Sequence, residues 1–178
     1  MILWKRVCRL GVTYLFNVGD KVVYPMHGAG IIESIEEKEF LGELNKYYIM
    51  RIPIGDMKVM IPMNNVDEIG LRDVVCEKTI NEVIEVLQNN ETDMSANWNH
   101  RYRANLEKMK TGDIYKLADV VRNLMLRNYE KGLSTGERKM LDNAKQIFIS
   151  ELALAKDLNQ EEAFKLLDNI IPEKNASI

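Results

Sequence analysis

The stretch NWNHRYRANL, residues 97–106, is the one place in the chain where an aromatic ring and several cations crowd together at a predicted helix start. Ser95 precedes it, and a serine caps a helix by accepting hydrogen bonds from the first free backbone N–H groups. This cap puts Trp98 in the first turn, where little chain lies behind the ring. A large ring at this position can protrude from the surface.

Two interpretations of Trp98 are open. In the first, the ring is a buried pin that packs the N-terminal module onto the helices, since tryptophan side chains are mostly buried. In the second, the ring is a wedge against nucleic-acid bases, while neighbouring side chains hold the flanking phosphates. The candidate DNA-binding neighbours are Asn97, His100, Arg101 and Arg103.

The distribution of charge favours the wedge. The chain of 178 residues has a formal net charge of −3, yet residues 15–96 carry −8 and residues 97–140 carry +5. Blocks of this kind suggest an acidic module for a protein partner and a basic face for phosphates.

A second group of cations surrounds the predicted turn between two later helices. If the helices fold this turn back beside residues 97–106, one continuous basic face results, as a minor-groove wedge requires. The group consists of Arg122, Arg127, Lys131, Arg138 and Lys139. Among them, Arg127, Arg138 and Lys139 are the candidate DNA contacts.

The first part of the chain has the pattern of a small β structure. Apolar and β-branched runs bounded by glycine and proline predict strands at residues 21–24, 31–35, 46–52 and 57–61. Several short strands within so few residues cover a core by curling into a small barrel. We predict this barrel over residues 15–68.

After residue 66 the hydrophobic period changes from two to about 3.6, which predicts a helical bundle over residues 69–178. The predicted helix caps are Thr79 with Glu82, Asp113, Ser134 with Glu137, and Asn159 with Glu162. The predicted fold class is therefore α+β, a small N-terminal β-barrel followed by an all-α bundle.

No group of residues has the spacing of a catalytic or metal site. Cys8 and Cys76 are the only cysteines, and His27 and His100 the only histidines, which disfavours zinc and a disulfide framework. Phosphate-binding loops and nucleophile motifs are absent from the sequence. Residues 1–14 hold no apolar run long enough for a signal sequence or a membrane span. We predict a cytoplasmic binding protein that is no enzyme and uses no cofactor, metal, membrane or small-molecule substrate.

Several motifs also resemble a known family. They are FNVGDKVVYPMHG at residues 16–28, NWNHRYRANL at 97–106, GD at 112–113, VVR at 120–122, GLSTGERKML at 132–141 and SELAL at 150–154. Together they resemble the CarD/CdnL transcription regulators over about residues 16–155. The N-terminal module is similar to the RNA-polymerase-interacting domain of the transcription-repair coupling factor.

The resemblance implies a Tudor-like β-barrel that docks on the β subunit of bacterial RNA polymerase. It also implies a helical domain that reaches promoter DNA at the upstream edge of the transcription bubble. Trp98 stands at the family's wedge, which enters the minor groove and stabilises the open complex. Arg101 and Arg103 match the basic neighbours of the wedge, and His100 stands where relatives often have arginine.

On the polymerase side, the resemblance puts Lys38 at a basic contact position and Met60 where several relatives have arginine, with Ile61 and Pro62 adjoining. It also puts Leu15 in the place of the initiator methionine. Residues 1–14 are therefore expected to be a non-native extension from an upstream start codon, or a disordered one.

The prediction is a nucleoid-associated regulator that binds RNA polymerase and upstream promoter DNA. Two alternatives stay open. One is an architectural DNA-binding protein that acts without polymerase. The other is a polymerase-bound adaptor that uses its helices for another protein, with Trp98 as the buried pin.

Overall fold

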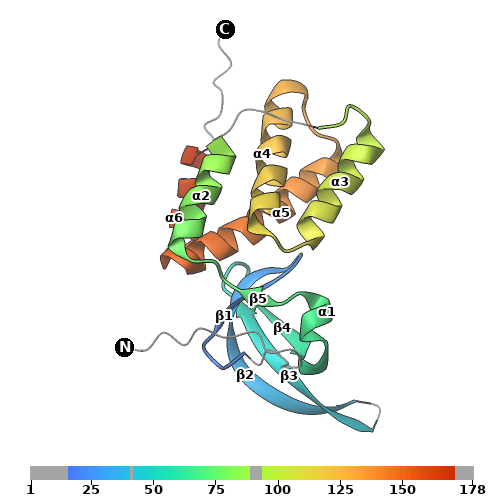
Figure 1. Cartoon of the computed structure of the whole chain (residues 1–178), viewed down its shortest axis with the longest axis vertical. Coiled ribbons are helices and arrows are strands. Elements are labelled where there is room, and N and C mark those ends of the chain that lie inside the picture. Colours follow the sequence, from blue (N-terminus) through green and yellow to red (C-terminus); the bar gives the residue numbers. More distant parts are fainter. Residues whose placement is uncertain (1–15, 41, 89–93, 171–178) are drawn as a thin grey trace.

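A computed structural model describes residues 16–40, 42–88 and 94–170, so the predicted extension at residues 1–14 lies outside it. The described chain forms a sheet module beneath a group of helices (Figure 1). None of the described helices combines the length and the hydropathy that a bilayer-spanning helix requires. The α+β class predicted from the sequence is confirmed.

The sheet is antiparallel, with its five described strands in the order β4-β3-β2-β1-β5. The strands are β1 (Lys21–Tyr24), β2 (Gly28–Phe40), β3 (Glu43–Ile52), β4 (Met57–Pro62) and β5 (Arg72–Asp73). A short 3₁₀ turn η1 (Met63–Asn65) and helix α1 (Val66–Ile69) connect β4 to β5. Among the described residues, β4 and β5 remain edges that do not pair with each other, so barrel closure is not confirmed.

Strand β2 is much longer than the predicted segment at residues 31–35. Its outer half pairs with β3 in a hairpin that projects away from the helices (Figure 1), with Glu37 opposite Lys46 and an ion pair of 3.3 Å between them. A register shift between Ile32 and Ser34 marks a β-bulge at the base of the hairpin. Tyr48 and Ile61 lie in the buried core beneath it.

The helices are α2 (Glu77–Gln88), α3 (Trp98–Lys110), α4 (Ile114–Lys131), α5 (Thr135–Lys156) and α6 (Gln160–Ile170). Helix α5 is central, because it packs against α2, α3, α4, α6 and strand β2. Their common core is apolar and includes Ile80, Leu124, Phe148, Leu152 and Leu167. The predicted helical bundle is confirmed.

Three of the predicted helix caps are present and two are wrong. Asp113, the Ser134/Glu137 pair and the Asn159/Glu162 pair make the expected capping hydrogen bonds. Thr79 does not cap α2, since the helix begins at Glu77 and its first bond runs from Ile80 N–H to the carbonyl of Cys76. Ser95 does not cap α3 because Asn97 stands closer and takes that role.

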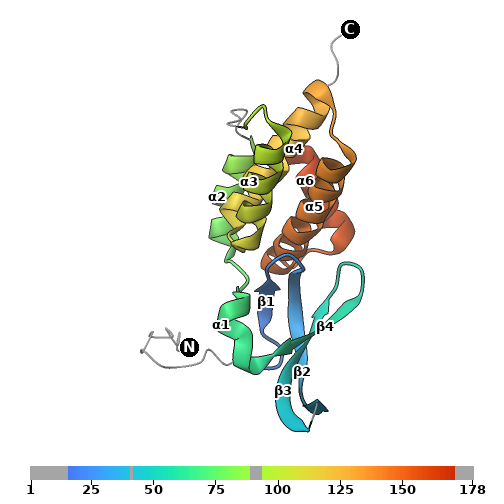
Figure 2. The same ribbon diagram turned by 90° about the vertical axis from the view of Figure 1, so that its right-hand side faces the viewer.

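The sheet and the helices are joined by a polar, closely packed junction. The hydroxyl of Ser150 on α5 accepts a hydrogen bond of 2.7 Å from the Ala29 backbone N–H. A Cβ at Gly28 would lie 2.8 Å from that hydroxyl oxygen, and Gly28 has a φ of 117° that favours glycine. Figure 2 shows the β1–β2 turn against the lower ends of the helices. This contact packs α5 closely against the sheet.

Candidate nucleic-acid interface

Trp98 is the first residue of α3 and is exposed. Asn97 caps the helix, its side-chain oxygen accepting a hydrogen bond of 3.3 Å from the His100 N–H. The Trp98 ring stacks on Tyr102, one turn further along α3, with 5.3 Å between ring centroids and 26° between planes. With 43% of its surface exposed, Trp98 does not fit the role of a buried pin.

The start of α5 lies directly beside this ring. Trp98 Nε1 donates a hydrogen bond of 3.0 Å to Ser134 Oγ. A Cβ at Gly136 would come within 3.6 Å of the Tyr102 ring and 3.7 Å of the Trp98 ring. The turn between α4 and α5 therefore folds back beside residues 97–106, as the predicted basic face requires.

Arg101 is buried, which corrects its predicted role as a direct phosphate contact. It is 3% exposed, and its Nε donates to Glu137 Oε1 at 2.6 Å. Its Nη1 donates to the backbone carbonyls of Ser95 and Ala96 at 2.8 and 3.2 Å. A guanidinium held in this way is not available to DNA, so Arg101 is part of the scaffold.

Glu137 is the acceptor at the centre of this scaffold. Burial by itself raises the pKa of its carboxyl, but hydrogen bonds from Arg101 and Ser134 outweigh burial and hold the pKa below its ordinary value. The Arg127 Nε lies 3.7 Å from Glu137 Oε1. Glu137 is therefore ionised at neutral pH between two arginines.

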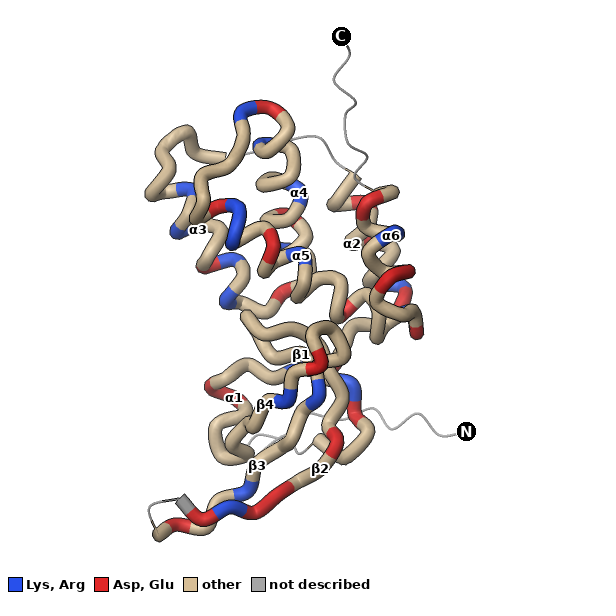
Figure 3. Tube along the Cα trace, turned by 180° about the vertical axis from the view of Figure 1, so that it is seen from behind, with Lys and Arg blue, Asp and Glu red and all other residues tan. Residues whose placement is uncertain are grey.

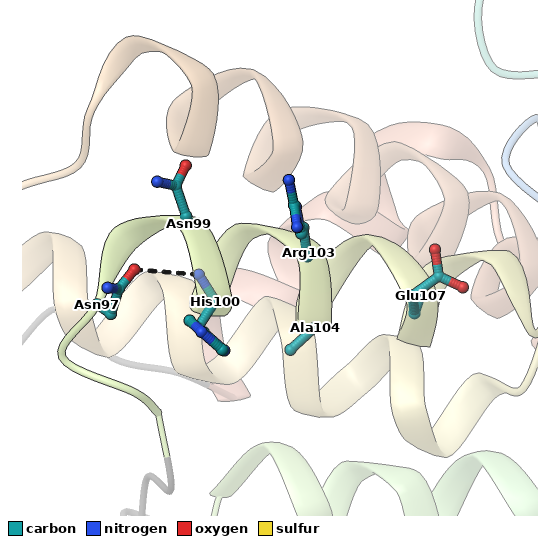
Figure 4. A pocket seen from close by; sticks show the side chains of 6 residues that line it. All are labelled: Asn97, Asn99, His100, Arg103, Ala104 and Glu107. Carbon is teal, nitrogen blue, oxygen red and sulfur yellow. Dashed lines mark hydrogen bonds between the residues drawn. The ribbon is translucent and has the colours of Figure 1, made fainter.

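The solvent side of α3 carries the exposed candidates. Asn97, Asn99, His100, Arg103, Ala104 and Glu107 line an open groove along the helix (Figure 4). Of the predicted contacts on this helix, Trp98, His100 and Arg103 are exposed to solvent. Asn97 is exposed as well, although its side-chain oxygen is used as the cap.

The second group of predicted cations also contains both exposed and buried side chains. Arg138 and Lys139 are exposed near the start of α5, and Figure 3 shows basic positions along α3 and the neighbouring helices. Arg127 is half-buried, and its Nε is a buried donor without a hydrogen-bond partner in the described part of the chain. Arg122 is buried, bound to Asp119, Asn123 and the Val86 carbonyl, so it belongs to the core.

Three of the predicted polymerase contacts, Met60, Ile61 and Pro62, lie on β4 at one edge of the sheet, and the fourth, Lys38, lies on β2. Met60 is 47% exposed, and Lys38 Nζ on β2 lies 3.4 Å from its sulfur atom. The Ile61 side chain is fully buried in the core, so the predicted contact at this position is limited to its backbone. Pro62 is half-buried at the end of the strand.

Sequence reasoning missed the residues that support Trp98. Ser134 and Glu137 were expected only to cap α5, and Tyr102 had no assigned role. The i, i+4 spacing of Trp98 and Tyr102 was the only local signal. Among the described residues, no group of three or more His, Cys, Asp or Glu side chains could hold a metal ion.

Comparison with known proteins agrees with this two-part structure. Residues 16–75 match the family model described as "CarD-like/TRCF RID domain", and residues 82–168 match "CarD, C-terminal domain". A protein of Bacillus subtilis (strain 168), "Putative transcription factor YdeB", is 45% identical over 148 residues, which are 83% of this chain and 97% of that protein. This chain belongs to the CarD family. CarD-family membership confirms the resemblance found in the motifs and supports a role in transcription regulation.

The two CarD-family matches leave only residues 76–81 between them. Strand β5 lies beyond residue 68 and pairs with β1, so the sheet continues past the boundary predicted from the sequence. The division into residues 15–68 and 69–178 therefore stays a prediction.

Proposed function

We propose that this CarD-family chain is a cytoplasmic, non-enzymatic transcription regulator that joins the nucleoid through RNA polymerase. In this proposal the sheet module binds the polymerase β subunit, and α3 with the start of α5 binds upstream promoter DNA. The single observation that supports it most is an exposed tryptophan at a helix start, stacked on Tyr102 and flanked by solvent-exposed cations.

On the DNA side, the Trp98 ring enters the minor groove at the upstream edge of the transcription bubble. Unstacking a base step costs a few kcal/mol, which contacts to the adjacent phosphates offset. Arg103, Arg138, Lys139 and His100 are the exposed candidates for these contacts, and Arg127, half-buried beside Glu137, is a further one. Phosphate contacts carry little sequence information, so promoter choice comes mainly from the polymerase.

On the polymerase side, the exposed parts of Lys38 and Met60 provide the contact, together with the backbone of the β4 edge at Ile61 and Pro62. An edge strand offers unpaired N–H and C=O groups to a strand of a partner. The match to the "CarD-like/TRCF RID domain" model supports this assignment.

The mechanism is a difference in affinity. A protein that binds the melted promoter more tightly than the closed one shifts the melting equilibrium by the difference in binding free energy. A difference of about 1.4 kcal/mol changes the equilibrium constant tenfold.

An architectural protein acting alone is disfavoured by the net charge of −3, since such proteins depend on phosphate attraction. A pure adaptor is disfavoured by the exposure of Trp98.

The test is the lifetime of open promoter complexes formed by the cognate polymerase with no factor, with the wild-type chain and with Trp98→Ala. We expect the wild-type chain to prolong the lifetime and Trp98→Ala to lose most of that effect while still binding polymerase. Equal lifetimes for wild type and Trp98→Ala would refute the wedge.

A further inference from the structure

The exposed indole of Trp98 is held by a hydroxyl whose hydrogen bonds all have assigned partners. Ser134 Oγ accepts from Trp98 Nε1 at 3.0 Å and from the Glu137 backbone N–H at 3.3 Å. The same hydroxyl donates to Glu137 Oε2 at 2.9 Å. A serine hydroxyl has one proton and two lone pairs, so its capacity is used in full.

The direction of this chain of hydrogen bonds is determined by charge. An ionised carboxylate only accepts hydrogen bonds, so the single proton of Ser134 must point to Glu137. The lone pairs of the hydroxyl then face the indole N–H, which only donates. Glu137 in this way orients the acceptor that Trp98 uses.

Arg101 closes the network on the other side. Its Nε bond to Glu137 is 2.6 Å long, and both side chains are 2% exposed. Its Nη1 also holds the two carbonyls that precede α3. The first turn of α3 and the first turn of α5 are thus tied together at two points, one through Arg101 and one through Trp98.

We propose that Ser134, Glu137 and Arg101 are positioning residues that order the Trp98 indole before it meets DNA. This inference rests on the proposed function, because it explains how an exposed ring becomes an efficient wedge. A side chain already held in its bound conformation loses less entropy on binding. The stacked Tyr102 ring supports the same orientation.

Helix capping alone does not explain the contact with Trp98. The Asn159/Glu162 pair caps α6 with the same two reciprocal bonds, both 2.9 Å long, and in the described part of the chain no aromatic N–H donates to it. This second capping box provides a matched control within the chain. Loss of either cap affects a helix start, but only one of them affects Trp98.

The experiment uses the full chain with Trp4→Phe, which leaves Trp98 as the only tryptophan. Into this background we place Ser134→Gly, Ser134→Thr, Asn159→Gly and, separately, Trp98→Ala. Glycine is nearly as good as serine at a helix start, so Ser134→Gly removes the hydroxyl with little loss of capping. The readouts are the time-resolved fluorescence anisotropy of Trp98 in the free protein and the lifetime of open promoter complexes.

We expect Ser134→Gly to increase the amplitude of fast Trp98 motion and to shorten the open-complex lifetime several-fold. Ser134→Thr restores both values, and Asn159→Gly changes neither. The proposal is overturned if Ser134→Gly behaves like Asn159→Gly in the anisotropy. If Trp98→Ala leaves the lifetime unchanged, the proposed function fails, whereas the anisotropy of Ser134→Gly still decides whether Ser134 orders the ring.

Discussion

At the scale of the residue, two arginines of the same helix have opposite environments. Arg101 is buried against Glu137, whereas Arg103 is exposed. Two residues correspond to about 200° around a helix, so the two side chains leave α3 on nearly opposite sides. The sequence shows that both are cations beside Trp98, but not which side faces solvent.

We expect Arg103→Ala and Arg101→Ala to affect different measurements. Arg103→Ala weakens DNA binding. It also reduces the magnitude of the slope of log K for DNA binding against log salt concentration by about one. Arg101→Ala leaves Glu137 as a buried charge without its main partner, which costs roughly 3–5 kcal/mol in the free energy of unfolding. Urea unfolding and binding titrations at several salt concentrations separate the two effects. A destabilised Arg103→Ala with unchanged DNA binding would contradict this assignment.

The lowered pKa of Glu137 predicts a pH dependence of stability. A carboxyl with a folded pKa below its unfolded value stabilises the fold fully above the unfolded pKa, and this contribution is lost as pH falls through the folded pKa. The unfolded value is about 4.3. The gap in unfolding free energy between wild type and Glu137→Gln is therefore largest near neutral pH and narrows below pH ~4. A gap that stays constant down to pH ~3 would contradict the ionised role of Glu137.

At the scale of the element, local signals predicted helices better than strands. The caps at Asp113 and Ser134 were predictable because each is made within three residues. The outer half of β2 was not predictable, because its acidic residues are not typical of a strand. The cross-strand partner Lys46, which pairs with Glu37, cannot be identified from the local sequence. Strand length there depends on pairing along the hairpin, which no local pattern contains.

The β4 edge provides a prediction for polymerase binding. Met60→Glu puts a charge at the exposed centre of the proposed contact and is expected to weaken polymerase binding at least several-fold. Val18→Glu is the control, since Val18 is also exposed but precedes β1, which is separated from β4 by two strands. Surface plasmon resonance on immobilised polymerase makes the comparison. Equal affinity of Met60→Glu and wild type would remove β4 from the interface.

At the scale of the whole molecule, the sheet and the helices are locked together by charge. Arg72 on β5 binds Glu151 on α5 through two hydrogen bonds of 2.6 and 2.8 Å, and donates a third of 2.7 Å to the Gly112 carbonyl. Glu151 is completely buried. The sequence predicted the two modules, but not this junction, because its members are 79 and 40 residues apart.

Removing either Arg72 or Glu151 alone is expected to destabilise the folded protein strongly. Arg72→Ala leaves the buried Glu151 carboxylate unpaired, at a cost of roughly 3–5 kcal/mol in unfolding free energy. The double variant Arg72→Met with Glu151→Leu recovers most of that loss, because neither charge then remains. Urea unfolding measures the unfolding free energies of the single and the double variant. A loss below about 1 kcal/mol for Arg72→Ala would show that the Arg72–Glu151 pair does not hold the modules together.

In the proposed function, Trp98 enters promoter DNA at the upstream edge of the bubble. Its most direct test places 5-iododeoxyuridine at single promoter positions in turn and maps photo-crosslinks to the chain in open complexes. We predict a crosslink at Trp98 that is confined to the upstream edge, requires polymerase and disappears in Trp98→Ala. Open complexes that the chain stabilises without any crosslink at Trp98, or with Trp98 crosslinked only to other positions of the DNA, would rule out this role of Trp98.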